Sequence, residues 1–492
     1  MSDRRLQLPF GFARRFGVAI AEVGDSHVRA ICLPDVTGEA LAEVRRFAGR
    51  PVEWETVDAD LFGRLLPRLY ESAGDASEMS GELEDHLALT DLADQLPAAE
   101  DLLDSANEAP LIRFLNAMLS EAVRQRASDI HIEPFAGHLA IRFRVDGILR
   151  EVLRPNRALS AAIASRIKVM ARLDIAEKRL PQDGRISLRV GGRPIDVRVS
   201  TLPASHGERV VLRLLDKQAG RLDTRELGLQ PRQLADLEAL VARPHGILLV
   251  TGPTGSGKTT TLYALLTALN TGRCNIITVE DPIEYHLEGI GQTQVNLKAG
   301  LDFARGLRAI LRQDPDIVMV GEIRDRATAE IAVQASLTGH LVLSTLHTNT
   351  AIGAIARLRD MGVEPFLLAS SLSGVVAQRL VRRLCPKCKF ARPASDTESA
   401  ALAFDQAASR PTLFHPAGCA ACRGEGYVGR FGLFEVVTMD DAMRERISLG
   451  TAEQELVALA RCHSSSMADS ARAAVLAGET TAEEALRVIY GD

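Results

Sequence analysis

The chain has 492 residues, a formal net charge of −6 at pH 7 and 25% charged residues. This length exceeds what one compact core holds, so we expect several domains. The mildly acidic balance argues against nucleic acid as a partner, because binding phosphate backbones needs a basic footprint. No uninterrupted apolar run reaches the roughly 20 residues that a membrane-spanning helix needs. We therefore expect a cytoplasmic protein that reaches a membrane only through another protein.

The N-terminal region divides into two parts. Residues 1–73 mix short apolar stretches with turns and predict a small α/β module. Residues 74–108 contain many acids and no lysine or arginine, which is typical of a flexible linker. The first module carries no catalytic motif, so we expect it to dock on a partner while the linker lets the rest of the chain move.

Two further domains are expected. A helix is predicted at residues 109–127, where apolar residues recur at helical spacing, and strand-like segments follow, so 109–218 is read as a second α/β domain. In residues 219–492 short apolar strands alternate with helices, a pattern that predicts a parallel sheet. A cysteine-rich module is expected at about residues 380–430 and an alanine-rich helical part at about residues 433–492.

A phosphate-binding loop is the most specific motif. The segment GPTGSGKT matches G-x-x-x-x-G-K-[ST] between an apolar strand and an apolar helix. Its glycines let backbone N–H groups close around phosphates, and the helix N-terminus adds a favourable dipole. The lysine is expected to reach the β- and γ-phosphates and the last hydroxyl to ligate Mg²⁺. The predicted site for ATP and Mg²⁺ consists of Gly252, Pro253, Thr254, Gly255, Ser256, Gly257, Lys258 and Thr259.

Acidic residues follow two other predicted strands. DPDIVMVGE ends in Glu322, a carboxylate expected to act on the metal shell or to polarise the attacking water. In ITVEDPIEY, Pro282 ends the strand and holds the acids at its C-terminal edge, where ligands of open α/β sheets bind. Either Glu280 or Glu284 is the expected general base, and the sequence does not choose between them.

Two histidines flank one predicted strand in GHLVLSTLHTNT. His347 lies among threonines and an asparagine, a polar cluster suited to sensing a γ-phosphate. For His340, at the other end of the strand, a structural and a functional role both stay open.

Two C-x-x-C pairs lie about thirty residues apart and predict a tetrahedral zinc site. Four thiolates leave no open position for a catalytic water, so the zinc is expected to be structural; a redox dithiol is the alternative. The ligands are Cys385, Cys388, Cys419 and Cys422. A basic cluster lies next to the cysteines and consists of Arg379, Arg382 and Arg383. Two interpretations of this cluster remain: a solvated face, or a surface that contacts an acidic partner or membrane headgroups.

In their order these motifs resemble the secretion ATPase superfamily of type II secretion, type IV pilus and conjugation systems. Its Walker A, Asp box, Walker B and His box are matched by GPTGSGKT, VEDPIEY, RQDPDIVMVGEIRD and GHLVLSTLHTNT. Upstream, RASDIHIEP, EKRLPQDGRI and GERVVLRLLDK extend the similarity. The opening LPFGFARRFGV and the tetracysteine module point to the type II secretion (general secretion pathway) protein E family, with type IV pilus assembly ATPases as the alternative.

This resemblance implies an architecture and partners. It implies a homohexamer of RecA-like domains, each preceded by a PAS-like domain, that hydrolyses ATP to drive pseudopilus assembly at the inner membrane. The implied partners are the cytoplasmic domain of an inner-membrane type II secretion protein and an inner-membrane platform protein. The PAS-like domain of such rings contributes arginines to the nucleotide, and Arg198 and Arg213 match those positions. Arg308 and Arg312 are weaker candidates for contacts between subunits.

Two other classes of protein fit the sequence less well. A nucleic-acid motor shares the RecA core, but the chain lacks the basic stripes and aromatic stacking platforms of that class. A nucleotide-gated scaffold without turnover is disfavoured because every acidic catalytic element is present. The sequence therefore predicts an ATPase that moves protein.

Overall fold

The structure of the chain is a computed structural model. It describes residues 16–24, 27–34, 36–58, 108–190, 193–216, 223–404 and 410–490, and the single positions Leu8, Phe12, Ala13, Leu61, Phe62 and Leu65. The predicted acidic linker lies outside these residues except for its last position. The chain divides into two compact units, one mainly of residues 1–97 and one mainly of residues 115–492, and each is treated by itself. Within the described part, no helix has the length and apolar character needed to cross a bilayer.

The first unit contains a three-stranded sheet in the order β1-β2-β3, with β1 antiparallel and β3 parallel to the central strand. Its elements are β1 (Val18–Val23), β2 (Val28–Cys32), α2 (Gly38–Ala48) and β3 (Val52–Thr56). The crossover helix α2 is capped at its N-terminus by Thr37, whose hydroxyl accepts a hydrogen bond from the Ala40 amide, and at its C-terminus by Gly49 in the left-handed conformation. Val44 of this helix and Val28 of the sheet belong to the same buried hydrophobic cluster. The predicted small α/β module is confirmed.

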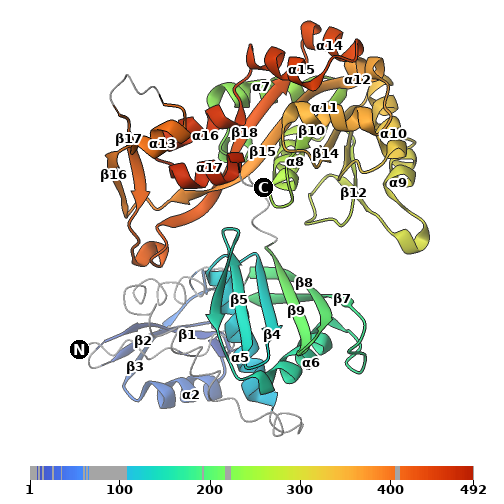
Figure 1. Cartoon of the computed structure of the whole chain (residues 1–492). Helices are drawn as coiled ribbons and strands as arrows, with labels where there is room; N and C mark the ends of the chain where they lie inside the picture. The colour runs from blue at the N-terminus through green and yellow to red at the C-terminus, as the bar shows by residue number, and fades with distance from the viewer. Residues whose placement is uncertain are drawn as a thin grey trace. The chain divides into compact units, whose positions relative to one another are not determined.

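The second unit begins with the predicted PAS-like domain. It holds a six-stranded antiparallel sheet in the order β6-β5-β4-β9-β8-β7 (Figure 1). Its elements are α5 (Glu108–Arg124, which starts in the first unit), β4 (Asp129–Pro134), β5 (Leu139–Val145), β6 (Ile148–Leu153), α6 (Ser160–Ala171), β7 (Gln182–Val190), β8 (Arg193–Ala204) and β9 (Gly207–Asp216).

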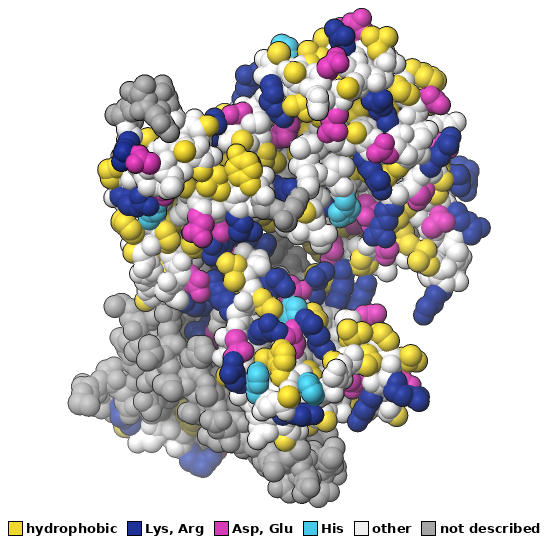
Figure 2. Space-filling model, viewed as in Figure 1, with side chains coloured by type: hydrophobic (Ala, Val, Ile, Leu, Met, Phe, Trp, Pro, Cys, Tyr) yellow, Lys and Arg dark blue, Asp and Glu magenta, His cyan; other side chains and the backbone are white. Residues whose placement is uncertain are grey.

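Alternation along β4 gives this sheet two different faces. Ile130 and Ile132 are buried apolar residues, whereas Asp129, His131 and Glu133 between them are polar and also buried. Successive side chains of a strand point to opposite faces, so one face joins the core and the other carries charge. Figure 2 shows dark blue basic side chains gathered with magenta acids over this part of the molecule.

A seven-stranded sheet in the order β12-β11-β13-β14-β10-β15-β18 forms the predicted RecA-like domain. All neighbouring strands are parallel except β18, which runs antiparallel to β15. Its elements are α7 (Pro231–Val241), β10 (Gly246–Thr251), α8 (Lys258–Leu269), β11 (Ile276–Glu280), β12 (Gly291–Gln294), α9 (Phe303–Ile310), β13 (Ile317–Val320), α10 (Arg326–Leu337), β14 (Leu341–Leu346), α11 (Ala351–Asp360), α12 (Pro365–Ser371), β15 (Leu372–Leu384) and β18 (Tyr427–Thr438).

The central strands are apolar along their whole length because helices cover both faces of the sheet. In β10, Ile247 and Leu249 join one hydrophobic core, and Leu248 and Val250 join the other. Figure 1 shows the helices of this domain arranged around the sheet. The apolar strands expected beside the phosphate loop, the two acidic segments and the histidines are β10, β11, β13 and β14.

The cysteine module and the C-terminal helices complete the second unit. Their elements are β16 (Lys389–Pro393), α13 (Asp396–Ala401), β17 (Thr412–Pro416), α14 (Asp441–Ser448), α15 (Glu453–Arg461), α16 (Met467–Leu476) and α17 (Ala482–Tyr490). Helices begin later than predicted, because Leu433 to Thr438 belong to the long strand β18 rather than to a helix. The predicted helical character holds from Asp441 onward.

Candidate nucleotide site and cysteine cluster

Parallel strands bring the motif residues to one edge of the sheet. The phosphate loop follows β10, Glu322 lies just beyond β13, and His347 directly follows β14. These strands are neighbours and run the same way, so their C-terminal ends meet where ligands of open α/β sheets bind. Nε2 of His347 lies 3.4 Å from Oε2 of Glu322. His340 precedes β14 at the opposite edge, where its Nδ1 lies 2.9 Å from the Ala335 carbonyl oxygen.

The backbone of the phosphate loop requires glycine at its first position and just before its lysine. Gly252 and Gly257 have φ values of 148° and 90°, in the region that favours glycine. A Cβ at Gly252 would lie 2.4 Å from the carbonyl oxygen of Gln378. Gly257 caps α8 without a side-chain hydrogen bond, so the helix N-terminus keeps amides for an anion. The hydroxyl of Ser256 in this loop is buried and has no hydrogen-bond partner among the described residues.

The side chain of Gln378, on β15, holds the phosphate loop in place through hydrogen bonds. Its Nε2 donates to the Ser256 carbonyl oxygen at 2.8 Å, and its Oε1 accepts from the Thr261 hydroxyl at 2.7 Å. The side chain is 2% exposed, so both bonds lie in the interior. Sequence reasoning missed Gln378, because the contact joins segments more than 100 residues apart and no local motif marks it.

Lys258 is a buried cation. Its Nζ donates to the carbonyl oxygens of Gly252 and Pro253, at 2.8 and 3.0 Å. Burial, opposed by the charge of Glu322 and assisted by that of Arg379, lowers the pKa of Lys258 to about 8. Arg379, predicted only as part of a basic cluster, therefore acts on the phosphate-loop lysine.

The surroundings of His347 favour a neutral imidazole. Burial and the charge of Lys258 lower its pKa, although the carboxylate of Glu322 acts in the opposite direction. Glu322 is also paired with Arg324, and its side chain is 13% exposed. The adjacent Thr348 hydroxyl lies 2.6 Å from the Thr251 hydroxyl at the end of β10. The His box is thus fastened to the strand that carries the phosphate loop.

The two glutamates of the Asp box lie in different environments. Glu280 is 3% exposed and is hydrogen-bonded to Tyr263, Thr278 and Gln292. The side chain of Glu284 is 33% exposed and pairs with Arg198 at 3.0 Å. The geometry therefore separates two acids that the sequence could not rank.

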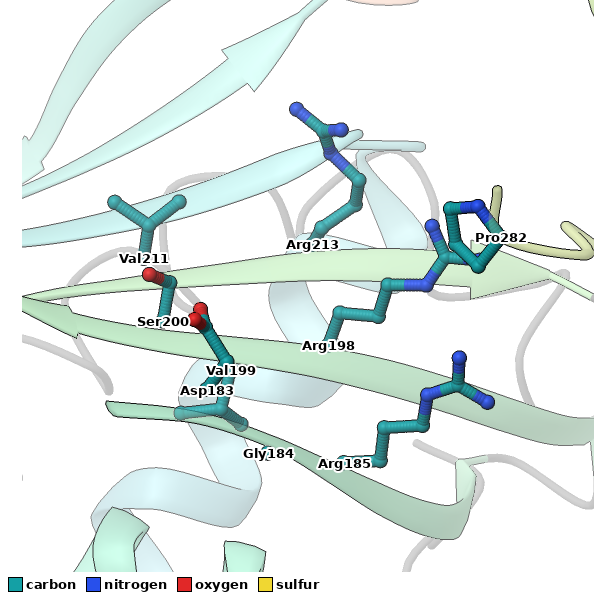
Figure 3. Close-up of a pocket in the computed structure, with 9 residues that line it drawn as sticks. All are labelled: Asp183, Gly184, Arg185, Arg198, Val199, Ser200, Val211, Arg213 and Pro282. Atoms are coloured by element: carbon teal, nitrogen blue, oxygen red, sulfur yellow. The ribbon is translucent and has the colours of Figure 1, made fainter. Parts of the chain in front are cut away.

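The predicted arginines of the PAS-like domain lie on neighbouring strands. Arg198 of β8 donates to the Ile283 carbonyl oxygen at 2.9 Å in addition to pairing with Glu284. Nε of Arg213, on β9, donates to Asp129 at 2.9 Å. Both line one cavity (Figure 3). Arg308 and Arg312 are exposed on and just after α9, where Arg312 donates to the Arg308 carbonyl oxygen.

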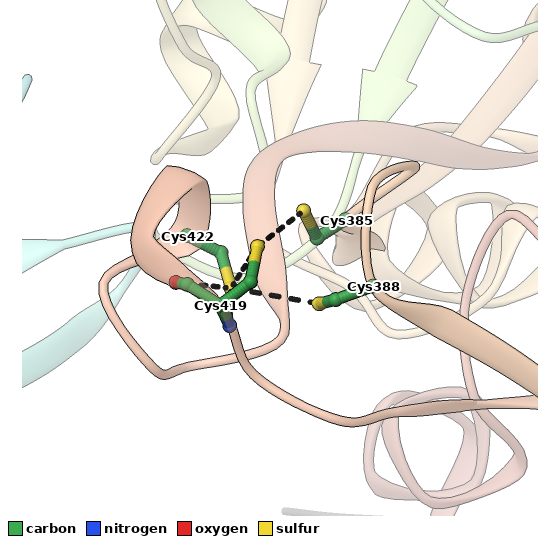
Figure 4. Close-up of side chains that lie close together, drawn as sticks. All are labelled: Cys385, Cys388, Cys419 and Cys422. Atoms are coloured by element: carbon green, nitrogen blue, oxygen red, sulfur yellow. Dashed lines mark hydrogen bonds between the residues drawn. The ribbon is translucent and has the colours of Figure 1, made fainter. Parts of the chain in front are cut away.

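The four predicted cysteines form one cluster (Figure 4). Their sulfur atoms all lie within 4.8 Å of one another, and three of the separations are 3.7, 3.7 and 3.9 Å. A tetrahedron with Zn–S bonds of about 2.3 Å has edges of about 3.8 Å. The sulfur positions fit a four-thiolate zinc site.

The other two residues of the predicted basic cluster, Arg382 and Arg383, contact other side chains of the same domain. Arg382 donates to Glu484 at 2.6 Å and lies 4.0 Å from the ring centroid of Tyr427. Arg383 lies over the ring of Phe431 at 4.8 Å. Burial would raise the pKa of Glu484, but hydrogen bonds from Arg382 and Arg487 outweigh it and lower the value to about 2. Arg382 therefore fastens α17 to β15, which argues against its binding lipid or a partner.

Parallel strands that deliver a phosphate loop, a carboxylate and a histidine to one edge of a sheet define a RecA-like P-loop ATPase. The model of the Type II/IV secretion system protein family matches residues 104–487, and a domain model of GSPII protein E matches residues 7–70. The chain belongs to this family, in its type II secretion protein E branch, as its motifs predict.

Relatives and solved structures agree with this placement. Type II secretion system protein E of Pseudomonas aeruginosa is 60% identical over 483 residues, covering 98% of this chain and 96% of the relative. The type II secretion system ATPase E of Vibrio cholerae is 54% identical over 488 residues, with coverage of 98% and 96%. The pilus retraction motor PilT with bound ADP matches with a TM-score of 0.52 and 26% identity, covering 76% of this chain and 96% of that one. The predicted ATPase is confirmed, and the pilus alternative is only distantly supported.

Proposed function

We propose that the chain is the ATP-driven motor of a type II secretion system, working as a homohexamer that promotes pseudopilus assembly. The observation that carries this proposal is the cluster of Lys258, Glu322 and His347 at one sheet edge. Relatives named for type II secretion that align over nearly the whole chain connect this cluster to protein export.

Lys258 and the loop from Gly252 to Thr259 bind the phosphates of ATP. The carbonyl oxygens that now hold the Lys258 ammonium give way to phosphate oxygens, which carry more charge. The exposed Thr259 hydroxyl is the loop's ligand for Mg²⁺. Bound Mg²⁺ neutralises charge that develops on the phosphate oxygens.

Two carboxylates act on the attacking water. Glu284 is the better candidate for the general base, because its side chain is partly exposed and, within the described part of the chain, pairs with Arg198. Glu322 polarises the water or the metal shell from the neighbouring strand. The neutral His347 senses the γ-phosphate through its contact with Glu322. Glu280, whose two oxygens are occupied, holds the Asp box in position.

Arg198 and Arg213 clamp phosphate oxygens when the PAS-like domain closes over a nucleotide. A guanidinium stays charged and presents two parallel N–H groups to an oxyanion. Arg198 already contacts the Asp box, which supports its place beside the reacting groups.

The tetracysteine module binds one structural zinc ion through Cys385, Cys388, Cys419 and Cys422. The sulfur separations support this assignment, and an all-thiolate set offers no position for a reacting water. Bound zinc supplies cross-linking of the two C-x-x-C turns, so its binding free energy contributes to folding.

The N-terminal module, residues 1–73, docks on the cytoplasmic domain of an inner-membrane secretion protein, and residues 74–108 form the tether. A ring that moves must be held by a component that does not move. The motor then acts on the platform protein of the inner membrane, which adds subunits to the pseudopilus. The moving parts are the PAS-like domain, residues 109–218, and the RecA-like domain, residues 219–492. Deleting residues 1–73 is expected to preserve basal hydrolysis and abolish membrane co-fractionation; a truncated chain that still co-fractionates would place the anchor elsewhere.

Export from living cells tests the function itself. Host cells whose only copy carries Glu322→Gln are expected to retain type II exoproteins in the periplasm, while a wild-type copy restores export. If the variant cells export normally but lose surface pili, the motor serves pilus assembly instead.

A further inference from the structure

Three arginines stand directly opposite one another on adjacent strands of the PAS-like sheet. Arg185 of β7 faces Arg198 of β8, and Arg198 faces Arg213 of β9. The same register continues from Arg213 to Asp129 of β4. Like charges placed directly opposite destabilise a sheet, so strand pairing does not account for this row.

The three members differ in how they are neutralised. Arg198 pairs with Glu284, and Arg213 pairs with the buried carboxylate of Asp129. Arg185 is exposed and makes no hydrogen bond or ion pair with the residues that the structure describes. The guanidinium of Arg185 is thus the member of the row that can pair with an anion from outside the chain.

A cavity of about 430 Å³ connects the three side chains. Figure 3 shows them rising from neighbouring strands toward the same side of the sheet, with Pro282 of the Asp box at the wall. Asp183 also lines the cavity, so the lining residues comprise three cations and one acid.

We propose that Arg185 is a third phosphate-binding arginine and that the row binds the polyphosphate chain of the nucleotide. This inference rests on the proposed function, in which Arg198 and Arg213 contact phosphate. A phosphate must compete with a carboxylate for each of those two, whereas Arg185 presents its full guanidinium fork without a competing carboxylate. The buried Asp129 acts as a positioning residue that fixes the direction of Arg213.

The test uses the full-length chain with inorganic tripolyphosphate as a competitive inhibitor of ATP hydrolysis. Arg185→Lys, Arg185→Gln and Arg185→Glu form a series of falling positive charge. The inhibition constant is expected to rise in that order, by about tenfold at Arg185→Gln. Arg154→Gln is the matched control. Among the described residues, Arg154 is exposed on the same domain and pairs with its neighbour Glu151, so its removal should change the constant less than about twofold.

Three results separate the possible failures. Equal inhibition constants across the Arg185 series, in a wild-type chain that hydrolyses ATP, would overturn the third arginine and leave the proposed function standing. No hydrolysis by the wild-type chain would overturn both. If inhibition by tripolyphosphate weakens equally in Arg185→Lys and Arg185→Glu, the effect does not depend on charge. That result would indicate a packing role for Arg185 and would also reject the proposal.

Discussion

The hydroxyl of Tyr263 donates a hydrogen bond to Oε2 of Glu280 in the protein interior. Oε1 of the same carboxylate accepts from the Thr278 hydroxyl at 2.6 Å and from Nε2 of Gln292 at 3.0 Å. Burial and the charge of Glu280 raise the pKa of Tyr263, so the phenol remains a donor. These contacts connect α8, β11 and β12 through one acid, which fits an anchor better than a proton acceptor.

Exchanging each Asp-box glutamate for its amide should separate the two roles. Glu284→Gln is expected to lower kcat about 100-fold, the contribution typical of a general base. Glu280→Gln should lower kcat less than about tenfold but destabilise the fold, because an amide would leave a buried group without a partner. Steady-state hydrolysis and thermal unfolding of both variants check this. A larger loss of turnover in Glu280→Gln than in Glu284→Gln would make the buried acid the base.

The lowered pKa of Lys258 predicts a pH limit for ATP capture. Its amine loses its proton near pH 8 in the free chain. Because kcat/KM reports the ionisation of the free enzyme, it should fall as the pH rises through about 8. A pH series of kcat/KM at constant ionic strength measures this. If kcat/KM stays constant up to pH 10, the pKa of Lys258 is not lowered in the free chain.

Zinc content can be counted directly. One zinc ion per chain is expected by elemental analysis, and Cys385→Ser or Cys422→Ser should lose it, with faster hydrogen exchange in β16 and β17. Cys462→Ser is the matched control, since Cys462 is an exposed cysteine outside the cluster. A metal-free wild-type chain with a protected module would reject the assignment.

Sequence reasoning succeeded where local pattern determines structure. Apolar runs identified the central parallel strands, and the glycine spacing of the phosphate loop identified its turn. Strand β18 was missed because its pairing with β15 is nonlocal and Arg430 and Gly432 interrupt its apolar pattern. The surroundings of Arg382 were missed for the same reason, because Glu484 lies 102 residues further along the chain. Charges were visible in the sequence, but their partners were not.

The ion pairs of Glu484 with Arg382 and Arg487 should stabilise α17. The fall in the pKa of Glu484 from 4.5 to about 2 corresponds to about 3 kcal/mol at neutral pH. Because the folded pKa is lowered, this stability is present above about pH 4.5 and disappears as the pH falls toward 2. Glu484→Gln should therefore speed hydrogen exchange of the α17 amides at pH 7. The exposed neighbour Glu483, changed to Gln, is the control, and equal exchange in both variants would contradict the account.

The most direct test of the account is the rate of phosphate release from ATP by the purified full-length chain. The wild-type chain is expected to turn over ATP, and Lys258→Ala should lose nearly all activity because the phosphates lose their main cationic partner. Glu322→Gln should still bind ATP but release phosphate at least about 100-fold more slowly, since its carboxylate acts in the transition state. Wild-type turnover by Glu322→Gln, or by Lys258→Ala, would contradict hydrolysis at this site.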